Sequence, residues 1–262
     1  MALLKTPEEI AALKEGGALL SRTLRELREA CVPGVTTEAL DALARKRFKE
    51  AGATPSFLGY RIDAHGTPFP GAVCISVNDE VVHGLPVPAR TLQKGDIVGL
   101  DIGVWWKGLC TDMATTVVVG GEQAVPEKTR ALVQDTREAL VRALGVVKAG
   151  GMVSDIGAAI EDFLKPKNYG IVKDLVGHGV GHAVHEEPQI PHYRDSHAPH
   201  IPLQAGMVLA IEPMVTLGGW QVDLLDDDWT VVTRDGSLSA HFELTVTVTE
   251  TGYELLTPWP DA

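Results

Sequence analysis

Cysteine is scarce in this sequence, and its scarcity excludes two kinds of site. Only Cys31, Cys74 and Cys110 are present, an odd number without any CxxC spacing. A disulfide framework needs paired cysteines, and a structural zinc site usually needs several thiolates. We therefore expect no disulfide framework, no thiolate zinc site and a reducing compartment.

Long apolar runs are also missing. No stretch of about eighteen apolar residues, the length of a membrane-spanning helix, occurs anywhere in the chain. Residues 1–17 carry Glu8, Glu9 and Glu15 and lack the apolar core of a secretory signal. These absences predict a cytoplasmic protein without a membrane partner.

Positive charge is in deficit. The chain has 23 Lys and Arg residues against 35 Asp and Glu residues, which gives a formal net charge of −12. Nucleic-acid binders usually gather Lys and Arg on one face, so we expect no specific nucleic-acid binding. No stripe of Lys and Arg indicates a contact with the ribosome either. The excess of carboxylates instead indicates that bound cations neutralise some of them.

A linker is missing as well. No Pro-, Gly- or Ser-rich break divides the 262 residues, so we predict a single domain over residues 1–262. No exposed heptad pattern or long apolar edge stands out, and we expect a monomer.

Helix and strand signals follow one another in the same order twice. Thr6-Pro7-Glu8-Glu9 has a capping residue, Pro at the first helical position and Glu three residues after the cap, which predicts a helix that Val32-Pro33-Gly34 ends. A second helix is predicted from about residue 37 to 51. Two more helices are predicted from Pro126 to about Lys148 and from a cap at Ser154 to Pro166. β-Branched runs predict strands at 73–77, 97–105, 111–119, 207–211 and 242–249.

The two halves also align residue by residue. Residues 95–101 match 206–212, so Asp101 coincides with Glu212. Asp112 coincides with Glu243 in the same way, and the segment His83-Gly84-Leu85-Pro86 coincides with His185-Glu186-Glu187-Pro188. Because internal repeats of this kind reflect repeated architecture, we expect one catalytic site between pseudo-symmetric halves of about 1–122 and 123–262.

Four carboxylates in apolar strands need partners. An unpaired buried charge would take up a proton or unfold its strand, whereas two divalent cations would cancel the charges of Asp101, Asp112, Glu212 and Glu243 together. His178, in a glycine-rich segment, would complete the ligand set. One imidazole among oxygen ligands suits Mn, Fe, Co or Zn. Two such ions about 3.5–4 Å apart can share a bridging water and generate hydroxide, which indicates a hydrolase.

Seven segments of the chain resemble the methionine aminopeptidase family, over essentially the whole length from Thr6 to Leu256. They are Val82-His83-Gly84-Leu85-Pro86, Leu100-Asp101-Ile102-Gly103, Cys110-Thr111-Asp112, Gly177-His178-Gly179-Val180-Gly181, His185-Glu186-Glu187-Pro188, Ile211-Glu212-Pro213 and Ser239-Ala240-His241-Phe242-Glu243. The resemblance implies an α+β pita-bread fold, with helix-helix-strand halves repeated about a pseudo-two-fold around a curved antiparallel sheet. Glu212 and Glu243 are only 31 residues apart, without the insertion of type II enzymes, so the chain resembles a bacterial-type minimal type I form.

The resemblance also implies a role for each site residue. A bridging hydroxide would attack the scissile carbonyl, with Glu212 as the proton shuttle. His83 and His185 would orient the substrate and stabilise the transition state. Asp112 and Glu243 would bridge two metal ions. The full set of five ligands would be Asp101, Asp112, His178, Glu212 and Glu243.

The methionine pocket matches the family less closely. Tyr60, Cys74 and Trp229 correspond to residues that line it, and Phe57 corresponds less well. The segment Arg61–Pro70 is longer than the family pattern. In addition, His182 stands where the family has Arg and Val184 where it often has an aromatic residue.

The implied activity is removal of the initiator methionine from nascent proteins whose second residue is small. An X-Pro aminopeptidase or dipeptidase with the same core is one alternative. Another is a non-catalytic pita-bread binding module, although such relatives usually lose metal ligands. No role is assigned to the remaining histidines, which are His65, His192, His197, His200 and His241.

Overall fold

The first two helices begin and end where the sequence signals predict. In the computed structural model, which describes residues 4–197 and 199–261, α1 spans Pro7–Ala30 and α2 spans Thr37–Ala51. The Thr6 hydroxyl accepts a hydrogen bond from Glu9 N–H, and Thr6 N–H donates to the Glu9 carboxylate, so the predicted capping box is confirmed. Helix α2 ends at Gly52, whose φ of 71° is a left-handed conformation that glycine adopts at little cost.

The second helix pair departs from the predicted bounds. Helix α3 spans Glu127–Leu144 and ends earlier than predicted, because Gly145 follows at its C-terminus. Helix α4 spans Val153–Leu164, so the prediction that Ser154 caps it is wrong. The Asp155 carboxylate instead accepts the Met152 N–H at 2.8 Å, which satisfies a donor at the helix start. Two short 3₁₀ helices complete the helical part: η1 (Glu122–Ala124) and η2 (Lys165–Lys167).

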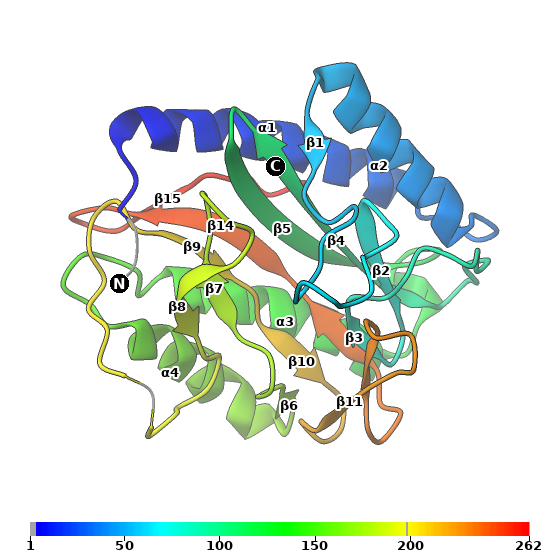
Figure 1. The fold of residues 1–262 in the computed structure, drawn as a ribbon. Helices are drawn as coiled ribbons and strands as arrows, with labels where there is room; N and C mark the ends of the chain where they lie inside the picture. The colour runs from blue at the N-terminus through cyan, green and yellow to red at the C-terminus, as the bar shows by residue number, and fades with distance from the viewer. Residues whose placement is uncertain (1–3, 198, 262) are drawn as a thin grey trace.

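A nine-stranded antiparallel sheet takes strands from both halves (Figure 1). Its order is β1-β4-β5-β14-β9-β7-β8, with β2 beside β4 and β15 beside β14. The strands span Thr54–Pro55 (β1), Val73–Val77 (β2), Ile97–Trp106 (β4), Leu109–Val118 (β5), Gly177–Gly179 (β7), Glu186–Ile190 (β8), Val208–Ile211 (β9), Glu243–Val248 (β14) and Tyr253–Leu255 (β15).

The order of the central strands confirms the predicted pseudo-symmetry. Strands β5 and β14, one from each half, pair antiparallel with Glu243 opposite Ala114. Strand β4 flanks β5, and β9 flanks β14 on the other side. The four strands that carry or precede the predicted carboxylates are therefore neighbours.

Helices pack against the sheet and leave one face for the site. Leu100 and Ile102 of β4 share a hydrophobic core with Leu20 and Leu24 of α1. Since side chains alternate along a strand, Asp101 points to the opposite face. Figure 1 shows α1 and α2 above the strands, α3 behind them and α4 below.

Two three-stranded sheets border the large one. Their orders are β13-β10-β6 and β11-β12-β3. The strands span Glu80–Val82 (β3), Gly170–Ile171 (β6), Met214–Thr216 (β10), Val222–Leu224 (β11), Val231–Thr233 (β12) and Ser239–His241 (β13). Within the described residues, no helix combines the length and apolar character needed to span a membrane.

Gly17 lets α1 approach the segment after β15, and replacing it should destabilise the fold. Helix propensity alone would favour Ala by about 1 kcal/mol. A Cβ at this position would, however, overlap the backbone carbonyl of Leu256, and such overpacking costs about 1–3 kcal/mol or more. We expect Gly17→Ala to lower the melting temperature by roughly 4–8 °C in a thermal unfolding experiment.

Gly252 provides the control for that experiment. A Cβ there meets no atom within 4 Å, so Gly252→Ala should leave the melting temperature nearly unchanged. A Gly17→Ala protein as stable as the wild type would show that the segment around Leu256 moves away without cost.

Candidate metal centre

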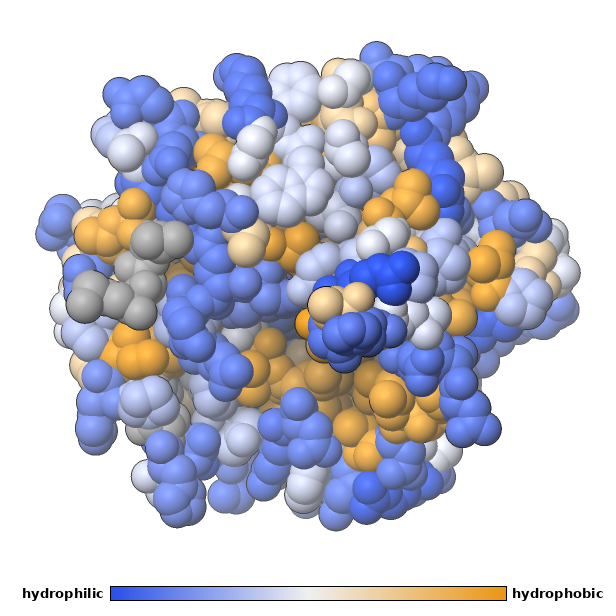
Figure 2. All heavy atoms as spheres, in the orientation of Figure 1, coloured by the Kyte–Doolittle hydropathy of each residue, from blue (hydrophilic) through white to orange (hydrophobic). Residues whose placement is uncertain are grey.

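One cavity of about 430 Å³ opens on the face of the sheet opposite α1. Figure 2 shows this side of the molecule hollowed near its middle, with hydrophobic side chains along the lower side of the hollow. The cavity is lined by every residue for which the sequence predicted a role: Tyr60, Cys74, His83, Asp101, Asp112, His178, His185, Glu212, Trp229 and Glu243. The structure therefore brings the whole predicted set together, while the individual roles stay predictions.

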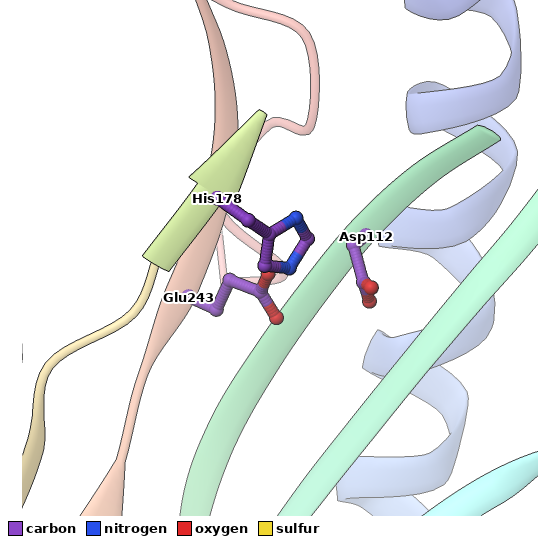
Figure 3. A group of neighbouring side chains, drawn as sticks. All are labelled: Asp112, His178 and Glu243. Carbon is purple, nitrogen blue, oxygen red and sulfur yellow. The ribbon is translucent and has the colours of Figure 1, made fainter. Parts of the chain in front are cut away.

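Three of the predicted ligands meet in the cavity. Asp112 extends from β5, His178 from β7 and Glu243 from β14, and they point toward one another (Figure 3). One ligand atom of each lies within 4.8 Å of the others. All three side chains are buried. His178 Nδ1 lies 2.9 Å from the Gly179 carbonyl oxygen, to which it donates, so its Nε2 carries the lone pair that a metal needs.

Two further carboxylates adjoin this cluster. Asp101 extends from β4, and Glu212 follows β9 with its Oε1 at 3.4 Å from His178 Nε2. Asp101 Oδ1, Asp112 Oδ1 and Glu243 Oε1 are buried without a hydrogen-bond partner in the described part of the chain. Buried acceptors are normally paired, and a divalent cation is a partner that fits oxygen-rich surroundings with one imidazole.

Burial dominates the titration of the cluster. It raises the pKa of Asp101 to about 7 and the pKa of Glu212 to about 8. Burial, followed by neighbouring carboxylate charges, also raises the pKa of Asp112 and of Glu243 well above their usual range. Because burial lowers the pKa of His178 to about 3, its contact with Glu212 joins two neutral groups at neutral pH and is not an ion pair. A divalent cation would favour the charged carboxylates and reverse their shifts, so these residues fit a metal.

The two predicted catalytic histidines are neutral and fixed in place. Burial lowers the pKa of His83 to about 4 and also lowers the pKa of His185. His83 follows β3 with a φ of 59°, a strained conformation of the kind found at functional sites. His185 Nδ1 lies 2.8 Å from the Tyr60 hydroxyl, and its ring centre lies 4.5 Å from that of His178. Each neutral imidazole keeps one N–H donor, which is what a developing oxyanion needs.

Aromatic rings and a thiol line the rest of the cavity. Cys74 lies opposite Asp101 in the β2–β4 pair, and burial raises the pKa of its thiol well above the usual value, so it stays protonated. The Trp229 ring lies edge-on to Phe69, with centres 5.2 Å apart, and its indole N–H donates to the Thr67 carbonyl at 3.1 Å. The segment Arg61–Pro70 thus contacts Trp229.

Sequence reasoning missed two histidines beside Glu212. Glu212 N–H donates to His192 Nε2 at 3.3 Å, and His241 Nε2 lies 3.4 Å from Glu212 Oε2. Both side chains are buried. His241 could have been found, because it lies two residues before Glu243 and continues the alternation of its strand. His192 gave no such signal, since it belongs to a His-rich segment in which His197 is exposed.

Comparisons with known proteins agree with this geometry. The profile of metallopeptidase family M24 matches residues 11–250. Methionine aminopeptidase 1 of Bacillus subtilis is 42% identical over 258 residues, which cover 98% of this chain and 99% of that protein. The crystal structure of a methionine aminopeptidase from Thermotoga maritima is 42% identical, with a TM-score of 0.91, and the match covers 98% of this chain and 99% of that one.

A prolidase from Pyrococcus furiosus shares the fold at 25% identity and a TM-score of 0.75, and the match covers 98% of this chain but 65% of the prolidase. The pita-bread fold prediction is therefore confirmed. With a profile match over most of its length and relatives at this identity and coverage, the chain belongs to metallopeptidase family M24.

Proposed function

We propose that the chain is a metal-dependent aminopeptidase that removes the N-terminal methionine from nascent proteins when the second residue is small. The observation that carries this function is the buried carboxylate–imidazole cluster with two neutral histidines beside it, in a chain that matches methionine aminopeptidases over almost its full length.

Two divalent ions, of Mn, Fe, Co or Zn, would be held by the five predicted ligands Asp101, Asp112, His178, Glu212 and Glu243. Bound there, they would polarise the scissile carbonyl and make water a nucleophile near neutral pH. The partnerless oxygens of Asp101, Asp112 and Glu243 support this assignment.

Glu212 is suited to carry a proton. Its carboxyl lies in the cavity wall beside the other predicted ligands, with Oε1 3.4 Å from His178 Nε2, within reach of a water held at the cluster. It would take the proton lost by the attacking water and pass it to the leaving amine. The neighbouring imidazoles of His178 and His241, each 3.4 Å from one of its oxygens, hold the carboxyl in the cavity.

His83 and His185 would donate hydrogen bonds to the scissile carbonyl as negative charge develops on its oxygen. Because both are neutral, they add no positive charge that would repel the cations. Tyr60, Cys74 and Trp229 would receive the methionine side chain, since a thioether packs well against aromatic rings and a protonated thiol.

The wider assignments follow from the same site. Residues 1–262 would act as a single catalytic domain, because both halves contribute strands to one sheet and residues to one cavity. A monomer would suffice, since the site residues come from one chain. Its substrates would be nascent polypeptides met in the cytoplasm near the ribosome.

Two tripeptides test the function. After chelation and addition of Mn, Fe, Co or Zn, we expect methionine release from Met-Ala-Ser and no cleavage of Ala-Pro-Ala. Glu212→Gln should abolish the release, because the amide cannot carry the proton. Cleavage of only the Ala-Pro bond would assign the chain to the X-Pro enzymes, and folded protein inactive with every metal would leave a binding module.

A further inference from the structure

Lys5, in the segment before α1, pairs with a carboxylate next to His185. Its ammonium group forms an ion pair with Glu186, which follows His185 and begins β8. The Lys5 and Glu186 side chains are only 1% and 8% exposed. Since burying two charges costs several kcal/mol per ion before they attract one another, such a pair needs well-fixed partners and is a weak device for stability alone.

The Glu186 carboxylate also organises the turn that leads to His185. Its Oε1 accepts the N–H groups of His182 at 2.5 Å and of Ala183 at 3.0 Å. At the start of the turn, the Gly181 carbonyl accepts the Cys110 N–H from β5 at 2.7 Å. The turn is thus tied to the strand that carries a predicted metal ligand on one side and to Lys5 on the other.

Gly181 provides the passage through which Lys5 reaches the turn. A Cβ at this position would overlap the Lys5 side chain, and the φ of 144° is one that other residues rarely adopt. The Lys5 side chain can therefore reach Glu186 only because residue 181 is a glycine.

Contacts at the start of α1 fix the backbone of Lys5. Lys5 N–H donates to the Gly206 carbonyl at 2.8 Å, and Thr6 caps the helix. Glu9 Oε1 lies 2.7 Å from His182 Nε2, so the first turn of α1 contacts the turn a second time.

We propose that Lys5 is a positioning residue for the hydrolysis: through Glu186 it fixes the backbone that carries His185. The Tyr60 hydroxyl, 2.8 Å from His185 Nδ1, fixes the rotation of the imidazole ring. The Lys5–Glu186 pair fixes the backbone position from which the His185 side chain extends. The inference rests on the proposed aminopeptidase function. Because a displacement of about 1 Å can cost about 100-fold in rate, loosening the turn should reduce kcat far more than it alters KM.

Three variants test the pair. Lys5→Met removes the cation, and Glu186→Gln removes the charge while keeping an oxygen that can accept the His182 and Ala183 N–H groups. With Met-Ala-Ser and Mn, both should lower kcat by about 10- to 100-fold with KM within about 3-fold of the wild type. Lys14→Met is the matched control, since Lys14 pairs with Glu254 on the surface, with side chains 42% and 51% exposed. It should change kcat by less than about 2-fold.

A His185→Ala background separates positioning from general structural damage. If Lys5 acts through His185, then Lys5→Met should lower kcat by less than about 3-fold once that ring is gone. An equal loss in both backgrounds would overturn the inference. So would kcat values near wild type in both Lys5→Met and Glu186→Gln, or the failure of both variants to fold.

The wild-type protein distinguishes failure of the inference from failure of the proposed function. No release of methionine by wild type with any metal would refute the proposed function and the inference with it. Active wild type with unimpaired Lys5→Met would refute only the positioning role.

Discussion

Glu243→Gln should lower methionine release by about 1,000-fold or more and, in metal-free protein at pH 8, raise the melting temperature above that of the wild type. The two effects have one cause. Burial and neighbouring carboxylate charges raise the pKa of Glu243 well above its usual range, so at pH 8 the metal-free protein must protonate this carboxyl or bury its charge when it folds, and either costs stability. A neutral amide of similar shape removes that cost but would be a much weaker ligand for the cations that Glu243 would hold.

The measurement pairs a Met-Ala-Ser assay with thermal unfolding after chelation. Glu250→Gln is the matched control, because Glu250 lies just beyond β14 and is exposed. It should change neither quantity appreciably. A Glu243→Gln protein that keeps wild-type activity would remove Glu243 from the ligand set, and one that melts well below wild type without metal would show that the carboxylate stabilises the fold through neutral contacts.

Metal-free protein should become less stable as the pH rises from about 5 to 8, by roughly 15 °C or more in melting temperature. The folded-state pKa values of Asp101, about 7, and Glu212, about 8, lie above the ordinary values of 3.8 and 4.5. A raised pKa means that the folded state binds the proton more tightly than the unfolded chain does. The resulting stability is fully present below about pH 4 and is lost as the pH rises through 7 to 8, at about 1.4 kcal/mol per pH unit for each group.

Adding Mn or Zn should reverse this trend, because cations bind the ionised carboxylates and their binding releases protons. The melting temperature gained on metal addition should therefore be larger at pH 8 than at pH 5. Metal-free protein whose melting temperature stays level or rises over this range would contradict the raised pKa values. The double variant Asp101→Asn with Glu212→Gln should lose part of the slope, because the raised pKa values of Asp112 and Glu243 contribute the remainder.

Much of the site could be predicted because its chemistry lies in local sequence. The capping box at Thr6 depends on neighbours a few residues apart, and the alternation of β14 places Glu243 on one face. The internal repeat in the sequence pairs Asp101 with Glu212 and Asp112 with Glu243. Short sequence separations and the alternation of side chains along a strand are sufficient for these predictions.

Other features depend on contacts between distant segments and carried no such signal. The burial of His192 against Glu212 joins the segments that follow β8 and β9, and the contact of Thr67 with Trp229 spans 162 positions of the chain. The misplaced cap at Ser154 shows a different limit. Two polar residues stood near the start of α4, and only the backbone geometry selected the Asp155 carboxylate as the acceptor.

The position of β14 between β5 and β9 sets a condition on synthesis. Both neighbours are made well before it, so a growing chain carries two unpaired strand edges until residue 248 has left the ribosome. Open edges of this kind invite pairing with other chains. The same late strand brings Glu243, so the nascent chain acquires its last predicted ligand and loses its exposed edges in one event. A truncated product would therefore be inactive and prone to aggregate, rather than a partial enzyme.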